Sequence, residues 1–110
     1  MQRRVRPRDE KHGQIREYLS ETRNPVTQED RRLKFKASRQ YEILNGKLFT
    51  RVMPGAKGAA KIARYMPRDE EVFDIVTSAH LGLLHPGIHK TFYEIEQTIA
   101  GISLKEVVEL

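Results

Sequence analysis

The segment YEILNGKLFTRV, residues 41 to 52, constrains the fold more than any other part of the sequence. Asn45 and Gly46 are the pair preferred in a two-residue type I′ turn, which needs positive φ angles at both positions. Residues of high β propensity in alternating pattern flank this pair on both sides. The segment therefore predicts an antiparallel β-hairpin with Tyr41 and Ile43 on one face.

A third short strand is expected shortly after the hairpin. The intervening stretch, MPGAKGAAK, is a loop by its Gly and Pro content. The next residues, KIARYMP, are typical of a strand that ends at Pro67, because proline has no backbone N–H to donate. The sheet is thus expected to be either a two-stranded hairpin or three-stranded.

The apolar pattern changes to helical spacing after Arg68. The first helix predicted there has three acidic residues, 69 to 71, in its first turn, where the helix dipole favours anions. It should end near Gly82. A second helix carries apolar residues from 88 to 99 and is broken at Gly101.

A last helix begins after Ser103, which with Glu106 has the spacing of a capping box. The apolar positions of these three helices are expected to face one another and to form the core of the C-terminal part. The predicted core residues are Phe73, Ile75, Val76, Ile88, Phe92, Ile95, Ile99 and Val107.

The N-terminal residues are less apolar. Residues 1 to about 10 are rich in arginine, which predicts disorder. Ile15, Tyr18 and Leu19 then have the spacing of a short amphipathic helix that should stop before Pro25.

A further helix follows, with Thr27 as its N-cap and the acidic pair Glu29 and Asp30 in its first turn. The expected fold class is therefore α+β and mostly helical: a basic helix, a small antiparallel sheet and a three-helix bundle. The expected divisions are a basic, partly disordered arm with a short helix (1–25), a helix with a hairpin (26–67) and a helical domain (68–110).

The excess positive charge lies in the first third of the chain. Residues 1 to 40 hold twelve Lys and Arg against six Asp and Glu, whereas residues 41 to 110 hold eight against nine. A basic segment of this kind attracts a polyanion, most often nucleic acid, although basic tails also serve only as solvated surface. The candidate phosphate contacts are Arg31, Arg32, Lys34, Lys36 and Arg39.

Several classes of protein are disfavoured. Cysteine is absent, so disulfide frameworks and thiolate nucleophiles are excluded. No apolar run is long enough for a membrane span and no secretory signal is visible, so a nuclear or cytoplasmic protein is expected. The acidic residues fall in helix first turns or at exposed helix positions, and no phosphate-binding loop or catalytic triad is visible, which indicates a protein that is not an enzyme.

The segment HLGLLHPGIHKT contains three of the four histidines. His80 should lie at the end of one helix and His85 at the cap of the next, with Pro86 at its first position, so the two imidazoles could share a zinc ion. His89 is expected to face solvent. The alternative is that these side chains are exposed or hydrogen-bonded to backbone.

HPGIHKT, residues 85 to 91, follows His80 and precedes an isoleucine-containing helix and the segment GISLKEVVEL. Upstream come a basic helix, a hairpin with an Asn-Gly turn, a segment ending in proline and a helix leading to His80. In this order the chain, from about residue 22 to residue 110, resembles the integrase-type zinc-binding domain, the HHCC zinc finger. That domain occurs at the N-terminus of retroviral and gypsy-type retrotransposon integrases and in fungal proteins derived from them.

The resemblance implies zinc ligation by His80 and His85 and binding to DNA. The family's Cys-x-x-Cys pair is missing here, so either the chain stops before that pair or the site has decayed, and zinc binding should be weak. Lys90, beside a packed Thr91, either reaches an anion such as phosphate or is merely solvated.

The function expected from these observations is a non-catalytic nucleic-acid-binding module. The resemblance allows two origins for it, a truncated or a domesticated remnant of a retrotransposon integrase. Its phosphate contacts would be indifferent to base sequence and sensitive to salt. No base-reading residues are identified, so DNA and RNA remain alternatives. A protein-interaction or dimerisation module, using the apolar C-terminal segment LKEVVEL, is the second hypothesis, and a relic without activity is the third.

Overall fold

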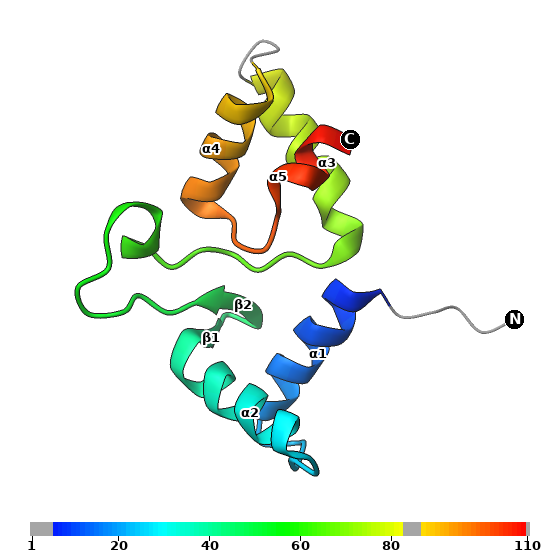
Figure 1. Ribbon diagram of the computed structural model, residues 1–110, viewed down its shortest axis with the longest axis vertical. Coiled ribbons are helices and arrows are strands. Elements are labelled where there is room, and N and C mark those ends of the chain that lie inside the picture. Colours follow the sequence, from blue (N-terminus) through cyan, green and yellow to red (C-terminus); the bar gives the residue numbers. More distant parts are fainter. Residues whose placement is uncertain (1–5, 83–86, 110) are drawn as a thin grey trace, which may run out of the picture.

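The computed structural model describes residues 6–82 and 87–109. Over these residues the chain is mostly helical with one small sheet, as the α+β prediction required (Figure 1). The elements in chain order are α1 (Pro7–Leu19), α2 (Gln28–Gln40), β1 (Tyr41–Leu44), β2 (Lys47–Thr50), a short 3₁₀ helix (Gly58–Lys61), α3 (Asp69–Gly82), α4 (Ile88–Thr98) and α5 (Leu104–Glu109).

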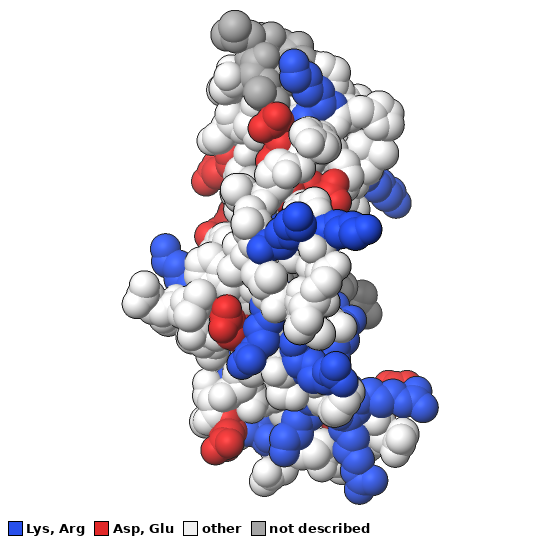
Figure 2. Space-filling model, turned by 90° about the vertical axis from the view of Figure 1, so that its left-hand side faces the viewer, with Lys and Arg blue, Asp and Glu red and all other residues white. Residues whose placement is uncertain are grey.

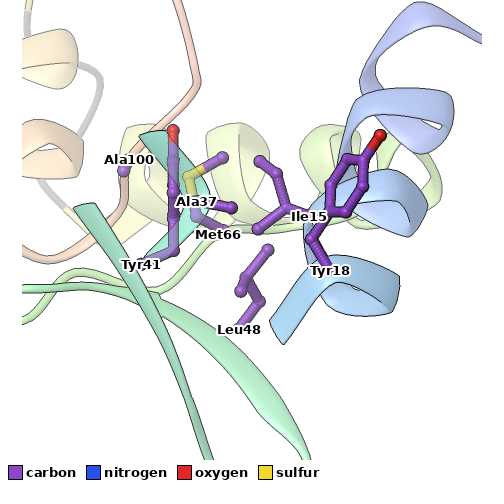
Figure 3. Close-up of a cluster of buried hydrophobic side chains, with 7 residues drawn as sticks. All are labelled: Ile15, Tyr18, Ala37, Tyr41, Leu48, Met66 and Ala100. Atoms are coloured by element: carbon purple, nitrogen blue, oxygen red, sulfur yellow. The ribbon is translucent and has the colours of Figure 1, made fainter. Parts of the chain in front are cut away.

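The molecule has two halves, each with its own apolar cluster. The N-terminal half comprises α1, α2 and the hairpin, and the C-terminal half comprises α3, α4 and α5 (Figure 1). Side chains from α1, α2 and the hairpin meet in the first cluster (Figure 3), which consists of Ile15, Tyr18, Ala37, Tyr41, Leu48, Met66 and Ala100. The second cluster joins the three C-terminal helices and consists of Val72, Val76, Ile95, Ile102 and Val107.

The predicted hairpin is confirmed. Asn45 and Gly46 have φ angles of 52° and 76°, the positive values that a type I′ turn requires. β1 and β2 pair antiparallel with Ile43 opposite Leu48. Leu48 is fully buried, so the hairpin is anchored through its inner face.

The third strand is not present, and this prediction was wrong. Within residues 61–67 only Tyr65 makes bridges, one antiparallel to Phe49 and one parallel to Ile99. The Tyr65 N–H donates to the Thr98 carbonyl at 2.9 Å, and the Tyr65 carbonyl accepts from the Ala100 N–H at 2.9 Å. This segment lies between the hairpin and the end of α4, so it links the two halves instead of extending the sheet.

The disorder expected up to about residue 10 is contradicted from Pro7 onward, because α1 begins there. Proline is favoured in the first turn of a helix, where its missing N–H costs nothing. Arg8 and Asp9 then find partners in the C-terminal half: Arg8 donates to Asp69 at 2.6 Å, and Asp9 accepts from the Asp69 backbone N–H at 2.8 Å. Composition alone contained no sign of these distant partners.

Two helix starts have the predicted caps. Thr27 Oγ1 accepts from the Asp30 N–H at 3.1 Å while Asp30 accepts from the Thr27 N–H at 3.1 Å, a complete capping box at α2. Ser103 and Glu106 form the same reciprocal pair at α5. The cap of α4 was misplaced, since Gly87 is the N-cap and the helix begins at Ile88 rather than at Pro86.

The predicted C-terminal core needs a correction. Phe73 is 59% exposed, because α3 turns Val72 and Val76 inward and leaves Phe73 on another face. Ile88, the first residue of α4, is 43% exposed. Val76, Ile95 and Val107 are buried, and Ile75, Phe92 and Ile99 pack against them partly buried.

None of the helices in the described ranges is long and apolar enough to cross a membrane.

Candidate nucleic-acid interface

The five basic residues predicted to contact phosphate all lie on α2. Each is exposed, and none forms an ion pair with another residue in the described part of the chain. Ala37, by contrast, is fully buried and Leu33 is partly buried in the first cluster, so α2 has one face inside and the cationic faces outside. The five are Arg31, Arg32, Lys34, Lys36 and Arg39, and we call them the α2 cations.

The positive charge that is concentrated early in the sequence lies mainly in the N-terminal half of the structure. Residues 1–68 contain eighteen Lys and Arg against seven Asp and Glu, whereas residues 69–110 contain two against eight. On the face that Figure 2 shows, Lys and Arg side chains gather over the lower part of the molecule, which contains α2 and the hairpin. The N-terminal half therefore carries the excess of positive charge and the C-terminal half the excess of negative charge.

α1 contributes to the basic surface a cation that sequence reasoning missed. Partial burial and repulsion from Lys36 on α2 lower the pKa of Lys11. Like charges this close raise the free energy of the unbound protein, and an anion placed between them relieves the repulsion. Only the packing of α1 against α2 brings these two lysines together, so their sequence separation gave no signal.

Lys90 does not join the α2 cations. It is exposed in the first turn of α4, in the acidic half and at the opposite end of the molecule from α2 (Figure 1). Its neighbour Thr91 is fully buried, and the Thr91 hydroxyl donates to the Gly87 carbonyl at 3.3 Å. Thr91 is thus packed as expected, whereas Lys90 lies on a different surface from the α2 cations.

His80 lies in the last turn of α3, as predicted, and is half-buried. Its Nδ1 is 3.5 Å from the Thr91 hydroxyl oxygen. It lines a cleft of about 400 Å³ whose walls include Phe73, Leu81 and Ile88. His80 is therefore surrounded mainly by apolar side chains.

The residues that are described do not fit a zinc site on their own. Among them no three His, Asp or Glu side chains lie close enough to hold a metal ion, and the chain has no cysteine. His85, the second predicted ligand, lies outside the described residues. His89 is exposed on α4, in agreement with its predicted orientation.

The fourth histidine, His12, belongs to none of the sequence motifs. It lies in α1 and is buried, with 5% exposure. Its Nε2 is 3.1 Å from the Met66 carbonyl oxygen, so the imidazole donates there as the Nε2–H tautomer. Burial, together with the positive charges of Arg16 and Arg68, lowers the pKa of His12 despite the bond to Met66. His12 thus ties α1 to the linking segment as a neutral side chain.

We expect a pH dependence of folding from His12. The unfolded chain takes up a proton on this imidazole below about pH 6.5 while the folded chain resists it, so the free energy of unfolding should fall with decreasing pH. The slope contributed by one such group is at most about 1.4 kcal/mol per pH unit. Urea unfolding between pH 7.5 and about pH 5 measures it.

The matched variants for this measurement are His12→Gln and His89→Gln. Loss of the pH dependence is expected in the first, whereas the exposed His89 should be replaceable without effect. An unchanged pH dependence in His12→Gln would rule His12 out as its source.

Comparison of the chain with known protein families, with characterised proteins and with experimentally determined structures gave no match.

Proposed function

We propose that this chain is a non-catalytic nucleic-acid-binding module that contacts the phosphate backbone through α2. The observation that carries the proposal is the set of α2 cations, five exposed basic side chains on one helix without ion-pair partners among the described residues. Unpaired cations on a fixed helix can replace the counterions of a phosphate backbone without first breaking salt bridges. The resemblance to integrase-type zinc-binding domains supports the same function, with DNA as the favoured ligand.

The test is an NMR titration of the ¹⁵N-labelled full chain with a mixed-sequence DNA duplex. Amide shifts should change along residues 28–40 and near Lys11, and should stay unchanged along α4, which contains Lys90. A second duplex of unrelated sequence should give the same pattern, since phosphate contacts carry no base information. Absence of shifts on α2 would refute the proposal.

Zinc is proposed to have only a small role in this chain. Among the described residues no three His, Asp or Glu side chains lie close enough to share a metal ion, and stable structural zinc sites use four ligands. Calorimetric titration with zinc should therefore reveal no site tighter than about 1 μM, far weaker than structural sites with binding free energies of about 10–16 kcal/mol. Tight binding that is lost in His80→Ala would contradict this prediction.

Self-association is the second candidate function, favoured by the cleft that His80 lines. Its walls carry Phe73, Leu81 and Val108, which are 59%, 55% and 54% exposed. Because this surface is apolar, two copies of the chain can bury it against each other about a two-fold axis. Sedimentation equilibrium should then detect a dimer that resists salt and is abolished by Leu81→Lys, and a monomer at every concentration would exclude it.

A further inference from the structure

Phe35 is an aromatic side chain exposed in the middle of the α2 cations. It is 62% exposed, although an aromatic ring of this size is usually buried. Arg31 precedes it by four residues and Arg39 follows it by four, so the three side chains share one stripe of the helix. The Arg39 guanidinium carbon lies 5.3 Å from the centre of the Phe35 ring.

A cleft opens beside Phe35, between α2, the end of α1 and the connection that joins them. Its volume is about 510 Å³, and Tyr18, Arg23, Asn24, Arg31 and Lys34 help to line it. Small-molecule sites have about this size, in the range of roughly 300–1,000 Å³. The cleft thus combines an aromatic wall, three cations, one amide side chain and the carboxylate of Glu21. Of the cations, Arg23 is paired with Glu17 at 2.9 Å, so Arg31 and Lys34 are the ones without an ion-pair partner among the described residues.

This combination is the chemistry that recognises an unpaired nucleobase. A base has a flat π face that stacks on an aromatic ring, an edge that pairs with an amide, and a phosphate on either side. Within a duplex the faces of each base are already covered by neighbouring bases, so stacking on Phe35 needs a single strand. The phosphates flanking that base are the groups that Arg31, Lys34 and Arg39 would neutralise.

We propose that the ligand of this surface is single-stranded nucleic acid, with one base stacked on Phe35 and held in the adjoining cleft. The inference rests on the proposed function, because it assumes that the α2 cations bind phosphates, and it adds which form of nucleic acid is preferred. A peptide made only of aspartate and glutamate shares the charge but has no flat ring to stack on phenylalanine.

The experiment compares three fluorescein-labelled ligands of equal length by anisotropy with the full chain: a thymidine single strand, an abasic single strand and a duplex. The abasic strand has the same phosphates but no bases to stack. The thymidine strand should bind about 10-fold more tightly than the abasic one, since one stacked base is worth about that factor. Phe35→Ala should remove this difference, and Phe35→Tyr should keep it.

The matched control is Phe73→Ala, because Phe73 is almost equally exposed, at 59%, but lies on α3 in the other half. It should leave the preference for the thymidine strand unchanged. Poly-glutamate of the same length should compete weakly.

The inference is overturned if thymidine and abasic strands bind equally, if Phe35→Ala retains the difference, or if poly-glutamate competes as well as thymidine. In the first two cases salt-sensitive binding would still support the proposed function. If none of the three nucleic-acid ligands binds, the proposed function fails as well.

Discussion

Replacing the α2 cations by glutamine is expected to weaken nucleic-acid binding by about 100-fold or more in low salt. Each of the five side chains is exposed and has no ion-pair partner in the described part of the chain, so each can release counterions from a phosphate. Glutamine is a good helix former, so α2 should remain intact. Anisotropy with a labelled oligonucleotide measures the affinity, and circular dichroism checks the helix content.

The control for this prediction removes the same amount of charge elsewhere. Five exposed lysines outside α2 can be changed to glutamine together: Lys47, Lys57, Lys61, Lys90 and Lys105. If binding depended only on net charge, both variants would lose the same affinity. We expect the control to lose only a few-fold, and equal losses would contradict the assignment of binding to α2.

Replacing Arg8 by alanine is expected to lower the free energy of unfolding by about 2–4 kcal/mol. Its guanidinium donates to Asp69 at 2.6 Å, to the Gly101 carbonyl at 2.9 Å and to both carboxylate oxygens of Glu106. The Arg8 side chain is only 15% exposed, and those of Asp69 and Glu106 are 22% and 30% exposed. Removing the cation leaves two poorly solvated carboxylates at the junction of the two halves.

Two variants separate this network from a general loss of charge. Arg6 pairs with the same carboxylate at 3.0 Å, but its side chain is 73% exposed, so Arg6→Ala should cost no more than about 0.5 kcal/mol. Arg8→Lys should recover only part of the loss, because an ammonium cannot reach both carboxylates as a planar fork does. Urea unfolding compares the three, and equal costs for Arg8→Ala and Arg6→Ala would refute the assignment.

The Arg8 network also makes stability sensitive to strong acid. Burial opposes ionisation of Glu106, but hydrogen bonds from Arg8 and from Ser103 outweigh it and lower its pKa. The stabilisation is therefore complete above the ordinary glutamate pKa of about 4.3 and is lost as the pH falls through the lowered value. The effect of His12 begins at a higher pH, below about 6.5, so the two effects differ in the pH at which each sets in.

The sequence predicted best the features whose cause is local. The Asn45-Gly46 turn, the Thr27 N-cap and the capping box of Ser103 and Glu106 each depend on residues at most three positions apart, and all three were predicted correctly. The α2 cations were identified as a group because they lie within nine residues of one another on one predicted helix.

Features that depend on distant residues were missed. Arg8 appeared to belong to a solvated arm, although its partner Glu106 is 98 positions away. Tyr65 was assigned to a strand from the local sequence. Its bridges to Phe49 and Ile99 involve residues far away in the chain, so the segment around Tyr65 could not predict them. Phe73 was placed in the core because it belongs to the apolar pattern of its helix. That pattern does not show how wide the buried face of the helix is.

Phe35 is an intermediate case. Phe35 stands among basic residues in the run RRLKFKASR, but it is two positions from both Leu33 and Ala37, a spacing that leaves the apolar face of a helix poorly defined and gives Phe35 no clear side. The structure separates them, since Ala37 is buried and Phe35 is exposed.

The salt dependence of nucleic-acid binding is the most direct test of whether the α2 cations bind phosphates. Anisotropy titrations of the full chain at several salt concentrations give the slope of log K against log salt. If the five α2 cations each neutralise a phosphate, this slope should be about −3.5 for a single strand or about −4.5 for a duplex. A slope near zero, or no binding at the lowest salt concentration, would mean that the α2 cations do not bind phosphates.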